Sequence, residues 1–312
     1  MLRKTILGAI AGLALAVAPG FASDWTPSGP IELQIGFGAG GETDTLGRVV
    51  ASVMEEQTGW NVVPQNKPGG GGVAMFTGLM NEKADGTVIA LGVNMPILIN
   101  LILRGDQLPF KLDSFEYLGT VTRAQLAIIA KADAPFNDMS SLVEYSKANG
   151  GVPVAFDAKP QELILKAINA QTGAGFKLIS TKSSAEMVQF ILGGQVMASF
   201  NAGTHIQYLE KGDIKMLASA NDGRHSYAKD ILTLREQGFD LYVDPYFYFA
   251  APGGISKEAK TALSNAIANA VNADKVRDIV ENAMLTTVQN LGPDGTTKML
   301  NDGLGSVGVL FK

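Results

Sequence analysis

The sequence predicts an α/β fold divided into two lobes, with a ligand cleft between them. Short strand-like runs alternate with amphipathic helical segments, which is typical of α/β domains with mostly parallel strands. The alternation restarts at about residue 124, and this indicates a second lobe. The chain of 312 residues is long enough for two domains, since one domain typically has about 150 residues.

The first lobe opens with a strand over residues 31–37, followed by a helix that Thr43 or Asp44 can cap. Apolar residues of this helix recur at intervals of three and four, and Gly59 ends it. A strand, a glycine-rich loop, a helix and a third strand come next; the strands are 60–63 and 88–93, and the loop is 66–72. The lobe therefore begins as two β-loop-α units and a third strand.

The second lobe is predicted over residues 125–245. We expect strands at 126–130, 152–156, 177–179 and 198–200, and helices at 141–148, 162–171 and 185–192. Residues 246–251 then form a strong strand pattern, and Ser256 can cap the long helix after it. No proline-rich, serine-rich or charged linker separates the halves, so we expect crossing strands to join them. Residues 24–124 and 246–312 are assigned to the first lobe.

Composition excludes several classes of function. The chain has 25 Lys+Arg against 30 Asp+Glu and no basic stretch, so we expect no nucleic acid partner. It has no cysteine and two histidines, so we expect no disulfide, no metal site and no cofactor. Neither G-x-S-x-G nor H-E-x-x-H occurs. We expect a protein that is not an enzyme, with a secreted hydrolase on a similar scaffold as the alternative.

Residues 1–22 are predicted to be a secretory signal peptide. Arg3 and Lys4 precede an apolar run at 6–17, and helix-breaking and small residues follow it. The run is shorter than the roughly 20 apolar residues that span a membrane, and we expect cleavage after Ala22. An uncleaved N-terminal anchor is the alternative. Export and the lack of cysteine both suit the bacterial periplasm.

The glycine-rich segment between the first strand and the first helix is the most informative part of the chain. Gly36, Gly38 and Gly41 satisfy the spacing G-x-G-x-x-G of a dinucleotide site. However, the second strand is not followed by the acidic residue that would bind the ribose. Glycines still allow a ligand to approach the backbone, and free N–H groups at a helix N-terminus favour an anion. A carboxylate would serve as well as a phosphate.

Several colinear motifs resemble one family over essentially the whole mature chain. Residues 36–48, GFGAGGETDTLGR, resemble the family segment P-F-x-P-G-G-x-x-D-x-x-A-R. Further matches are NKPGGGG at 66–72, ADGT at 84–87, ILGGQV at 191–196, LTLREQG at 232–238 and APGG at 251–254. The family comprises the periplasmic solute-binding proteins of tripartite tricarboxylate transporters, also called Bug proteins.

The resemblance implies a periplasmic binding protein fold of type II whose lobes close over a small carboxylate. The ligand would be a di- or tricarboxylate or a related organic acid, delivered to the membrane permease subunits of the transporter. A ligand-sensing partner of a signalling receptor would share the same site, and we expect a monomer. Loop amides and water hold the ligand in such proteins, which implies contacts from Phe37, Gly38, Ala39, Gly40, Gly41 and, at the start of the helix, Asp44.

The second lobe departs from the family pattern, so its candidate contacts rest on position. Asp157 and Lys159 stand where the family has a turn of small residues, and Lys182 and Ser183 replace its Y-x-G stretch. At strand-to-helix turns, the two lysines would offer cationic donors opposite the glycine-rich loop. The alternative to a role in ligand binding is that both lysines are solvated at the surface.

Strand ends supply the remaining candidates, because ligands of α/β sheets bind beyond the carboxyl ends of strands. Asn94 follows the third strand of the first lobe, and Asn201 follows the predicted strand at 198–200. His205 is a weaker candidate by the same rule. His225, beside an arginine, is expected at the surface.

Overall fold

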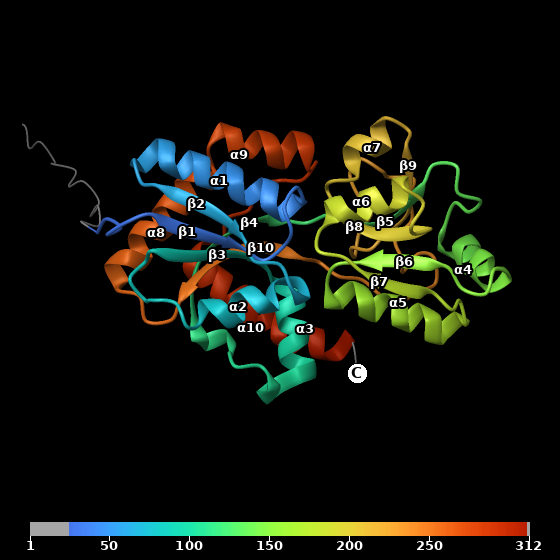
Figure 1. The fold of residues 1–312 in the computed structure, drawn as a ribbon, viewed down its shortest axis with the longest axis horizontal. Helices are drawn as coiled ribbons and strands as arrows, with labels where there is room; N and C mark the ends of the chain where they lie inside the picture. The colour runs from blue at the N-terminus through green and yellow to red at the C-terminus, as the bar shows by residue number, and fades with distance from the viewer. Residues whose placement is uncertain (1–24, 311–312) are drawn as a thin grey trace, which may run out of the picture.

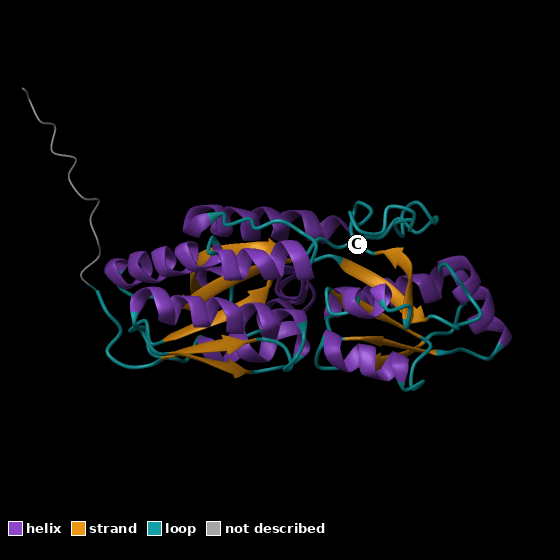
Figure 2. Ribbon diagram, turned by 90° about the horizontal axis from the view of Figure 1, so that it is seen from above, coloured by secondary structure: helices purple, strands orange, loops and turns teal. Residues whose placement is uncertain are grey.

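The computed structural model describes residues 25–310, which form two α/β bodies side by side (Figure 1). The predicted signal peptide lies outside the described residues. Each body has one five-stranded sheet. Helices lie on both faces of the sheets, as the view from above shows (Figure 2). No described helix is both long enough and apolar enough to cross a membrane.

The first sheet has the strand order β2-β1-β3-β10-β4. Its strands are β1 Ile31–Ile35, β2 Val62–Asn66, β3 Val88–Val93, β4 Phe115–Arg123 and β10 Tyr246–Pro252. The helices around it are α1 Glu42–Thr58, α2 Val73–Leu79, α3 Asn94–Arg104, α8 Lys257–Val271, α9 Asp274–Asp278 and α10 Gly292–Leu310. Short helical turns occur at Gly70–Gly72, Gly105–Gln107, Leu112–Ser114 and Ile279–Ala283.

The second sheet has the strand order β7-β6-β8-β5-β9. Its strands are β5 Leu126–Lys131, β6 Pro153–Phe156, β7 Lys177–Ser180, β8 Ala198–Ala202 and β9 Ile214–Ser219. The helices are α4 Met139–Ala148, α5 Lys159–Thr172, α6 Ser184–Leu192 and α7 Ile206–Glu210. We propose that the lobes divide as expected from the sequence, with residues 24–124 and 246–312 in lobe I and 125–245 in lobe II.

Four of the five strands in each sheet run in the same direction, as expected, and one strand runs against them. β1 runs parallel to β2 and β3, and β6 runs parallel to β7 and β8. In contrast, β10 is antiparallel to β3 and β4, and β5 is antiparallel to β8 and β9. The reason is the path of the chain: β5 and β10 each begin where the chain has just crossed between the sheets, so they run away from the crossing while their neighbours run toward it.

An aromatic cluster fills the core under the first sheet. Phe76 stacks on Tyr248 with ring centroids 5.7 Å apart and an interplanar angle of 11°. Phe115 and Phe110 pack against Phe76 at 5.1 and 6.3 Å between centroids. Tyr248 and Phe76 are both almost fully buried. Large rings of this kind contribute strongly to core stability, and here they fix β10 against the helices below it.

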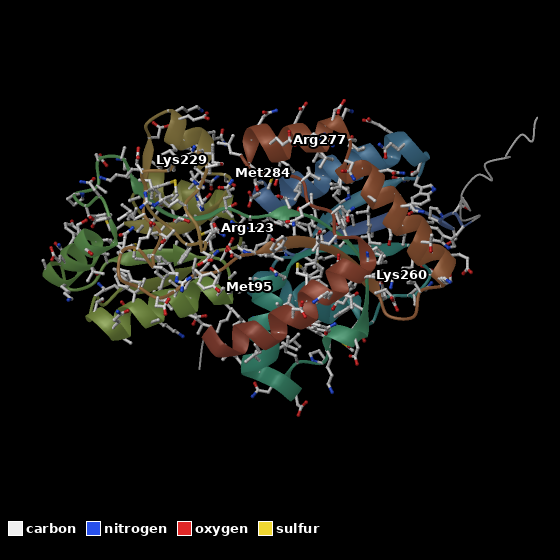
Figure 3. The ribbon with its side chains drawn as sticks, turned by 180° about the vertical axis from the view of Figure 1, so that it is seen from behind. Met95, Arg123, Lys229, Lys260, Arg277 and Met284 are labelled. Atoms are coloured by element: carbon white, nitrogen blue, oxygen red, sulfur yellow. The ribbon has the colours of Figure 1, made fainter. Side chains whose placement is uncertain are left out.

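The crossing segments, residues 123–126 and 243–246, join the two lobes. Their backbones meet directly, because the amide of Ala124 donates to the carbonyl of Pro245 at 2.8 Å. The ion pair between Arg123 and Asp244, at 3.5 Å, adds a side-chain link. Figure 3 shows Arg123 at this junction from behind. The two crossing segments therefore run between the lobes as a hydrogen-bonded pair rather than as separate linkers.

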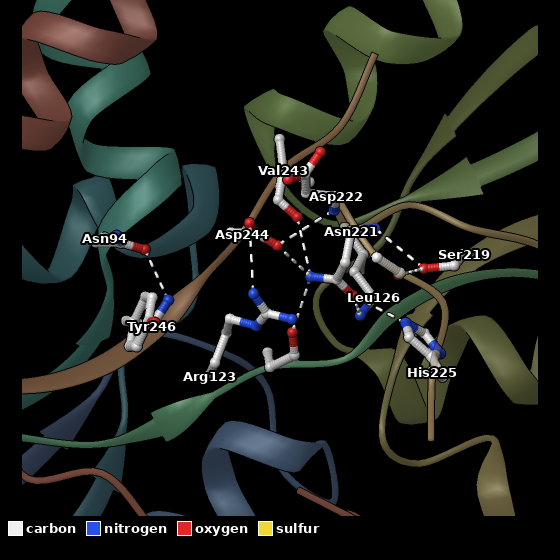
Figure 4. A network of polar contacts seen from close by, with 12 residues as sticks. Asn94, Arg123, Leu126, Ser219, Asn221, Asp222, His225, Val243, Asp244 and Tyr246 are labelled. Atoms are coloured by element: carbon white, nitrogen blue, oxygen red, sulfur yellow. Dashed lines mark hydrogen bonds and ion pairs between the residues drawn. The ribbon is translucent and has the colours of Figure 1, made fainter. Parts of the chain in front are cut away.

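Asn221 holds the crossing segments together from lobe II (Figure 4). Its Nδ2 donates to the carbonyls of Ala124 and Val243 at 3.2 and 3.0 Å, one on each segment. Its Oδ1 accepts from the amide of Leu126 at 2.7 Å and contacts Nε2 of His225 at 2.9 Å. The residue is 1% exposed. One buried side chain thus satisfies backbone groups of both segments.

Candidate ligand-binding cleft

A small cavity of about 50 Å³ lies between the lobes beside the crossing segments. This is room for a few water molecules. Both lobes line it: Phe37, Gly41, Glu42, Thr43, Val93, Met95, Pro96, Phe247, Ala124, Leu126, Val243, Pro245, Asp157, Ala158, Pro160, Gln161, Ser183, Ser184 and Ala202. A wider hollow of about 760 Å³ adjoins it and shares Phe37, Asp157 and Ala158. We call the first the inner cavity and the second the outer hollow.

Four helices begin at the inner cavity, namely α1, α3, α5 and α6. Each follows a strand, so the strand-to-helix turns of both sheets converge on one point. Helix N-termini carry free amides and partial positive charge, which favour an anion. No lysine, arginine or histidine is among the described residues that line the inner cavity. Donors to an anion there would be backbone amides and the neutral side chains of Thr43, Gln161, Ser183 and Ser184.

The glycine-rich loop after β1 reaches across to lobe II. The amide of Gly38 donates to the carbonyl of Lys182 at 2.8 Å, and that of Gly40 donates to Oδ2 of Asp44 at 2.8 Å. Phe37 and Gly41 line the inner cavity, whereas Ala39 is exposed. In this arrangement the loop uses two of its amides to close the lobes and shape itself. The ligand contacts expected of these five residues stay a prediction.

Asp44 braces this loop and does not cap the helix. The helix N-cap is Gly41, so the expected capping by Thr43 or Asp44 is wrong. Asp44 is 4% exposed and also accepts hydrogen bonds from Arg48 at 2.9 Å and from Asn66 at 2.8 Å. Burial alone would raise the pKa of Asp44, but these bonds and the one from Gly40 lower it below its usual value.

The two asparagines proposed from strand ends make hydrogen bonds to other groups of the protein. Oδ1 of Asn94 accepts from the amides of Met95 at 2.7 Å and Tyr246 at 2.8 Å, which ties α3 to a crossing segment. Asn201 donates to the carbonyl of Ser184 at 2.8 Å and accepts from the amide of His205 at 2.9 Å. Neither asparagine lines the inner cavity.

The four candidates of lobe II lie in different parts of the cleft. Asp157 and Ser183 line the inner cavity, and Ser183 is also the N-cap of α6. Lys159 and Lys182 line the outer hollow. Nζ of Lys159 is 2.9 Å from Oε2 of Glu162, an ion pair within α5. The two lysines therefore line the outer hollow, Ser183 lines the inner cavity, and Asp157 lines both.

Both histidines are buried, so the expectation of a surface position for His225 is wrong. His205 and His225 contact the hydroxyl of Tyr227 at 2.8 and 2.9 Å. Burial lowers the pKa of His205 to about 3 and that of His225 to about 4. The burial of His225 was missed because a histidine beside an arginine resembles a surface residue, whereas its contact with Asn221 places it against the crossing segments.

Glu42 is the principal site residue that sequence reasoning did not select. It is the first residue of α1, is 7% exposed and lines the inner cavity. Burial, and then the nearby charge of Asp157, raise the pKa of Glu42 to about 8. Burial also raises the pKa of Asp157, to about 6. An acidic residue next to the glycine-rich loop could have indicated a site residue. However, an acidic residue at a helix N-terminus is also explained by its favourable interaction with the helix dipole.

The stability of the protein is expected to decrease as the pH rises from 6.5 to 8. Native Glu42 keeps a proton that the unfolded chain loses above about 4.5, so its contribution falls by up to about 1.4 kcal/mol per pH unit. The histidines act in the opposite direction, because their native pKa values are lowered from 6.5, and their effect fades as the pH rises above 6.5. Asp157 acts in the same direction as Glu42 but mainly below pH 6. Urea unfolding of wild type and Glu42→Gln at these pH values checks this, since the variant should lose the slope. An unchanged slope in the variant would exclude Glu42 as its source.

The two α/β lobes, the paired crossing segments and the cavity between them define a two-lobed solute-binding protein. The family model of the tripartite tricarboxylate transporter family receptor matches residues 46–311. The chain belongs to this family, and the prediction made from its motifs is confirmed. Members of the family are receptors that bind solutes for transport, which agrees with the two lobes and the cleft.

Known proteins resemble the chain over nearly its whole length. It is 27% identical to Protein BugT of Bordetella pertussis over 285 residues, which cover 88% of this chain and 87% of BugT. The structure of the periplasmic binding protein BugD matches with a TM-score of 0.83 at 24% identity, covering 92% of this chain and 97% of BugD. MatC of Rhodopseudomonas palustris, solved with malate, matches with a TM-score of 0.83 at 19% identity, covering 92% of this chain and 100% of MatC. These structures confirm the predicted fold class.

Proposed function

We propose that this protein is exported to the periplasm, binds a small organic carboxylate as a monomer and delivers it to the membrane permease of a tripartite transporter. The observation that carries the proposal is the convergence of four helix N-termini, two from each lobe, on a cavity that no basic side chain of the described residues lines. Amides from both lobes can hold a carboxylate there, so ligand binding and lobe closure are the same event. The bound malate of MatC and the family of this chain support this ligand class.

We propose that the chain binds its ligand without changing it. In the part of the chain that the structure describes, no group of three or more His, Cys, Asp or Glu residues could hold a metal ion. Both described histidines contact Tyr227 and asparagines, not a serine nucleophile. This arrangement favours binding over the hydrolase alternative.

A panel of mono-, di- and tricarboxylates is expected to raise the melting temperature of the purified mature protein. At a ligand concentration of 100 times Kd, binding to the native state alone adds about 2.7 kcal/mol to the free energy of unfolding. A micromolar Kd corresponds to about −8 kcal/mol. Differential scanning calorimetry measures the shift, and mass spectrometry of the recovered ligand tests for turnover. No shift with any carboxylate would refute the ligand class, and a chemically altered ligand would show an enzyme.

Export is tested separately by intact-mass analysis of periplasmic and cytoplasmic fractions. We expect a product cleaved after Ala22 in the periplasmic fraction, because the segment at 1–22 has the charge and apolar pattern of a signal peptide. A full-length protein retained with the membrane would instead identify an uncleaved anchor.

A further inference from the structure

A chain of side-chain contacts runs through lobe II from the inner cavity to the crossing segments. At one end, Asn201 donates to the carbonyl of Ser184, the first residue of α6, which lines the inner cavity. At the other end, Asn221 donates to a carbonyl of each crossing segment (Figure 4). Two histidines and a tyrosine connect these ends. We call the five side chains the relay: Asn201, His205, Tyr227, His225 and Asn221.

Backbone contacts fix which way the amide of each asparagine points. Nδ2 of Asn201 donates to the carbonyl of Ser184, and its Oδ1 accepts from the amide of His205. Nδ2 of Asn221 donates to backbone carbonyls, and its Oδ1 accepts from the amide of Leu126. Turning either amide over would set an oxygen against a carbonyl and an NH2 group against a backbone N–H. Each end of the relay therefore presents an acceptor to the histidine beside it.

The relay has one contact more than it has hydrogens. Nδ1 of His205 faces Oδ1 of Asn201, and Nε2 faces the hydroxyl of Tyr227. Nδ1 of His225 faces the same hydroxyl, and Nε2 faces Oδ1 of Asn221. Burial keeps both rings neutral at pH 7, because it lowers the pKa to about 3 for His205 and, with the charge of Arg123, to about 4 for His225. Two neutral histidines and one tyrosine supply three hydrogens for these four contacts. One contact must therefore bring two acceptors together.

The distances indicate where the hydrogen is missing. The contact between Nδ1 of His205 and Oδ1 of Asn201 is 3.3 Å long, whereas the other three are 2.8–2.9 Å long. Both histidines then carry their hydrogen on Nε2, and Tyr227 accepts from His205 and donates to Nδ1 of His225. If the hydroxyl turned the other way, both hydrogens would lie on Nδ1, and the two acceptors would meet at Asn221 instead.

Building on the proposed carboxylate-binding function, we propose that Tyr227 is a positioning residue whose hydroxyl sets the tautomers of both histidines and so connects the inner cavity to the crossing segments. The direction of this hydroxyl decides which asparagine has a complete set of hydrogen bonds. In the described structure that residue is Asn221, so the crossing segments are held firmly. Asn201 is the weaker end, and the start of α6 is therefore the part that can adjust to a ligand.

Nitrogen-15 NMR of the imidazole rings tests the tautomers directly, because the chain has two histidines. The mature protein is made without a histidine tag, and a long-range proton–nitrogen correlation at pH 7 distinguishes protonated from unprotonated ring nitrogens. In the wild type, both rings should carry the hydrogen on Nε2. In Tyr227→Phe, the hydrogen of His205 should move to Nδ1, where it can be donated to Asn201. His225 should keep its hydrogen on Nε2, because Asn221 still accepts it.

Tyr208→Phe is the matched control. Tyr208 is half-buried in α7, three residues after His205, and its hydroxyl takes no part in the four contacts of the relay. This variant should keep both tautomers of the wild type. Calorimetric titration with the best ligand of the carboxylate panel should show binding weakened about 2- to 10-fold in Tyr227→Phe, the range expected for one neutral hydrogen bond. In Tyr208→Phe the affinity should stay unchanged.

The outcomes separate this inference from the proposed function. A hydrogen on Nδ1 of His205 in the wild type would overturn the inference, and so would a His205 tautomer that is the same in Tyr227→Phe. An unchanged ligand affinity in Tyr227→Phe would refute the positioning role. Circular dichroism checks that each variant folds; if Tyr227→Phe does not, the wild-type tautomers decide. If no carboxylate binds to the wild type, the proposed function is refuted, and the tautomer assignment is still decided by the spectra.

Discussion

Replacing Gly38 with valine is expected to weaken ligand binding by about 10- to 100-fold, because added atoms at this position cost about 1–3 kcal/mol in a packed contact. A Cβ at Gly38 would lie 3.1 Å from the carbonyl oxygen of Lys182 and 3.3 Å from Cβ of Ser183. The larger valine side chain would therefore hold the glycine-rich loop of lobe I away from lobe II. Calorimetric titration with the best ligand of the carboxylate panel measures the loss.

Gly29→Val is the control for this change. Gly29 has the same residue type and no atom within 4 Å of an added Cβ, so valine there should leave affinity unchanged. Gly38 does not have a positive φ, so valine adds no backbone strain and the variant should fold normally. Equal affinities of Gly38→Val and Gly29→Val would show that this contact between the lobes is not part of the bound state.

Asn221→Ala is expected to destabilise the protein by about 3 kcal/mol or more, because each buried group left without a hydrogen bond costs about 1–3 kcal/mol. The substitution removes the acceptor of the Leu126 amide and the donor to the Ala124 and Val243 carbonyls, all at the crossing segments. Urea unfolding followed by circular dichroism measures the change.

Asn301→Ala provides the comparison for Asn221→Ala. Asn301 is exposed and donates only to a carbonyl of its own helix, at 3.0 Å. Removing an exposed bond of this kind should change stability by less than about 0.5 kcal/mol. Similar losses in the two variants would argue against Asn221 as the residue that organises the crossing.

Much of the fold could be predicted because buried strands are continuous apolar runs in the sequence. β3 lies at the expected residues 88–93, and the apolar strand β5 begins at the expected Leu126. β4 was missed because its sequence, FEYLGTVTR, mixes polar residues and glycine into the strand. α3 was missed because its run of apolar residues follows β3 without a turn signal. The local pattern of apolar residues gives no boundary where one element passes directly into the next.

The site was predictable only in part, for a different physical reason. The position of the glycine-rich loop follows from local sequence, because glycines and a helix start identify an anion-binding turn. The burial of Glu42 instead depends on Gly203, more than 160 residues away, which covers it only when the lobes meet. Likewise, nothing local distinguishes Lys182 in the outer hollow from Ser183 in the inner cavity.

The position of β10 has a consequence for how the chain matures. β10 lies between β3 and β4 in the first sheet, although more than 120 residues separate it from β4 in the sequence. The first sheet therefore cannot be completed until residue 252 has left the ribosome, whereas all five strands of the second sheet are available by residue 219. Domains generally fold as units, in the order in which they are synthesised. Lobe I would thus stay incomplete until late in synthesis, after every strand of lobe II has become available.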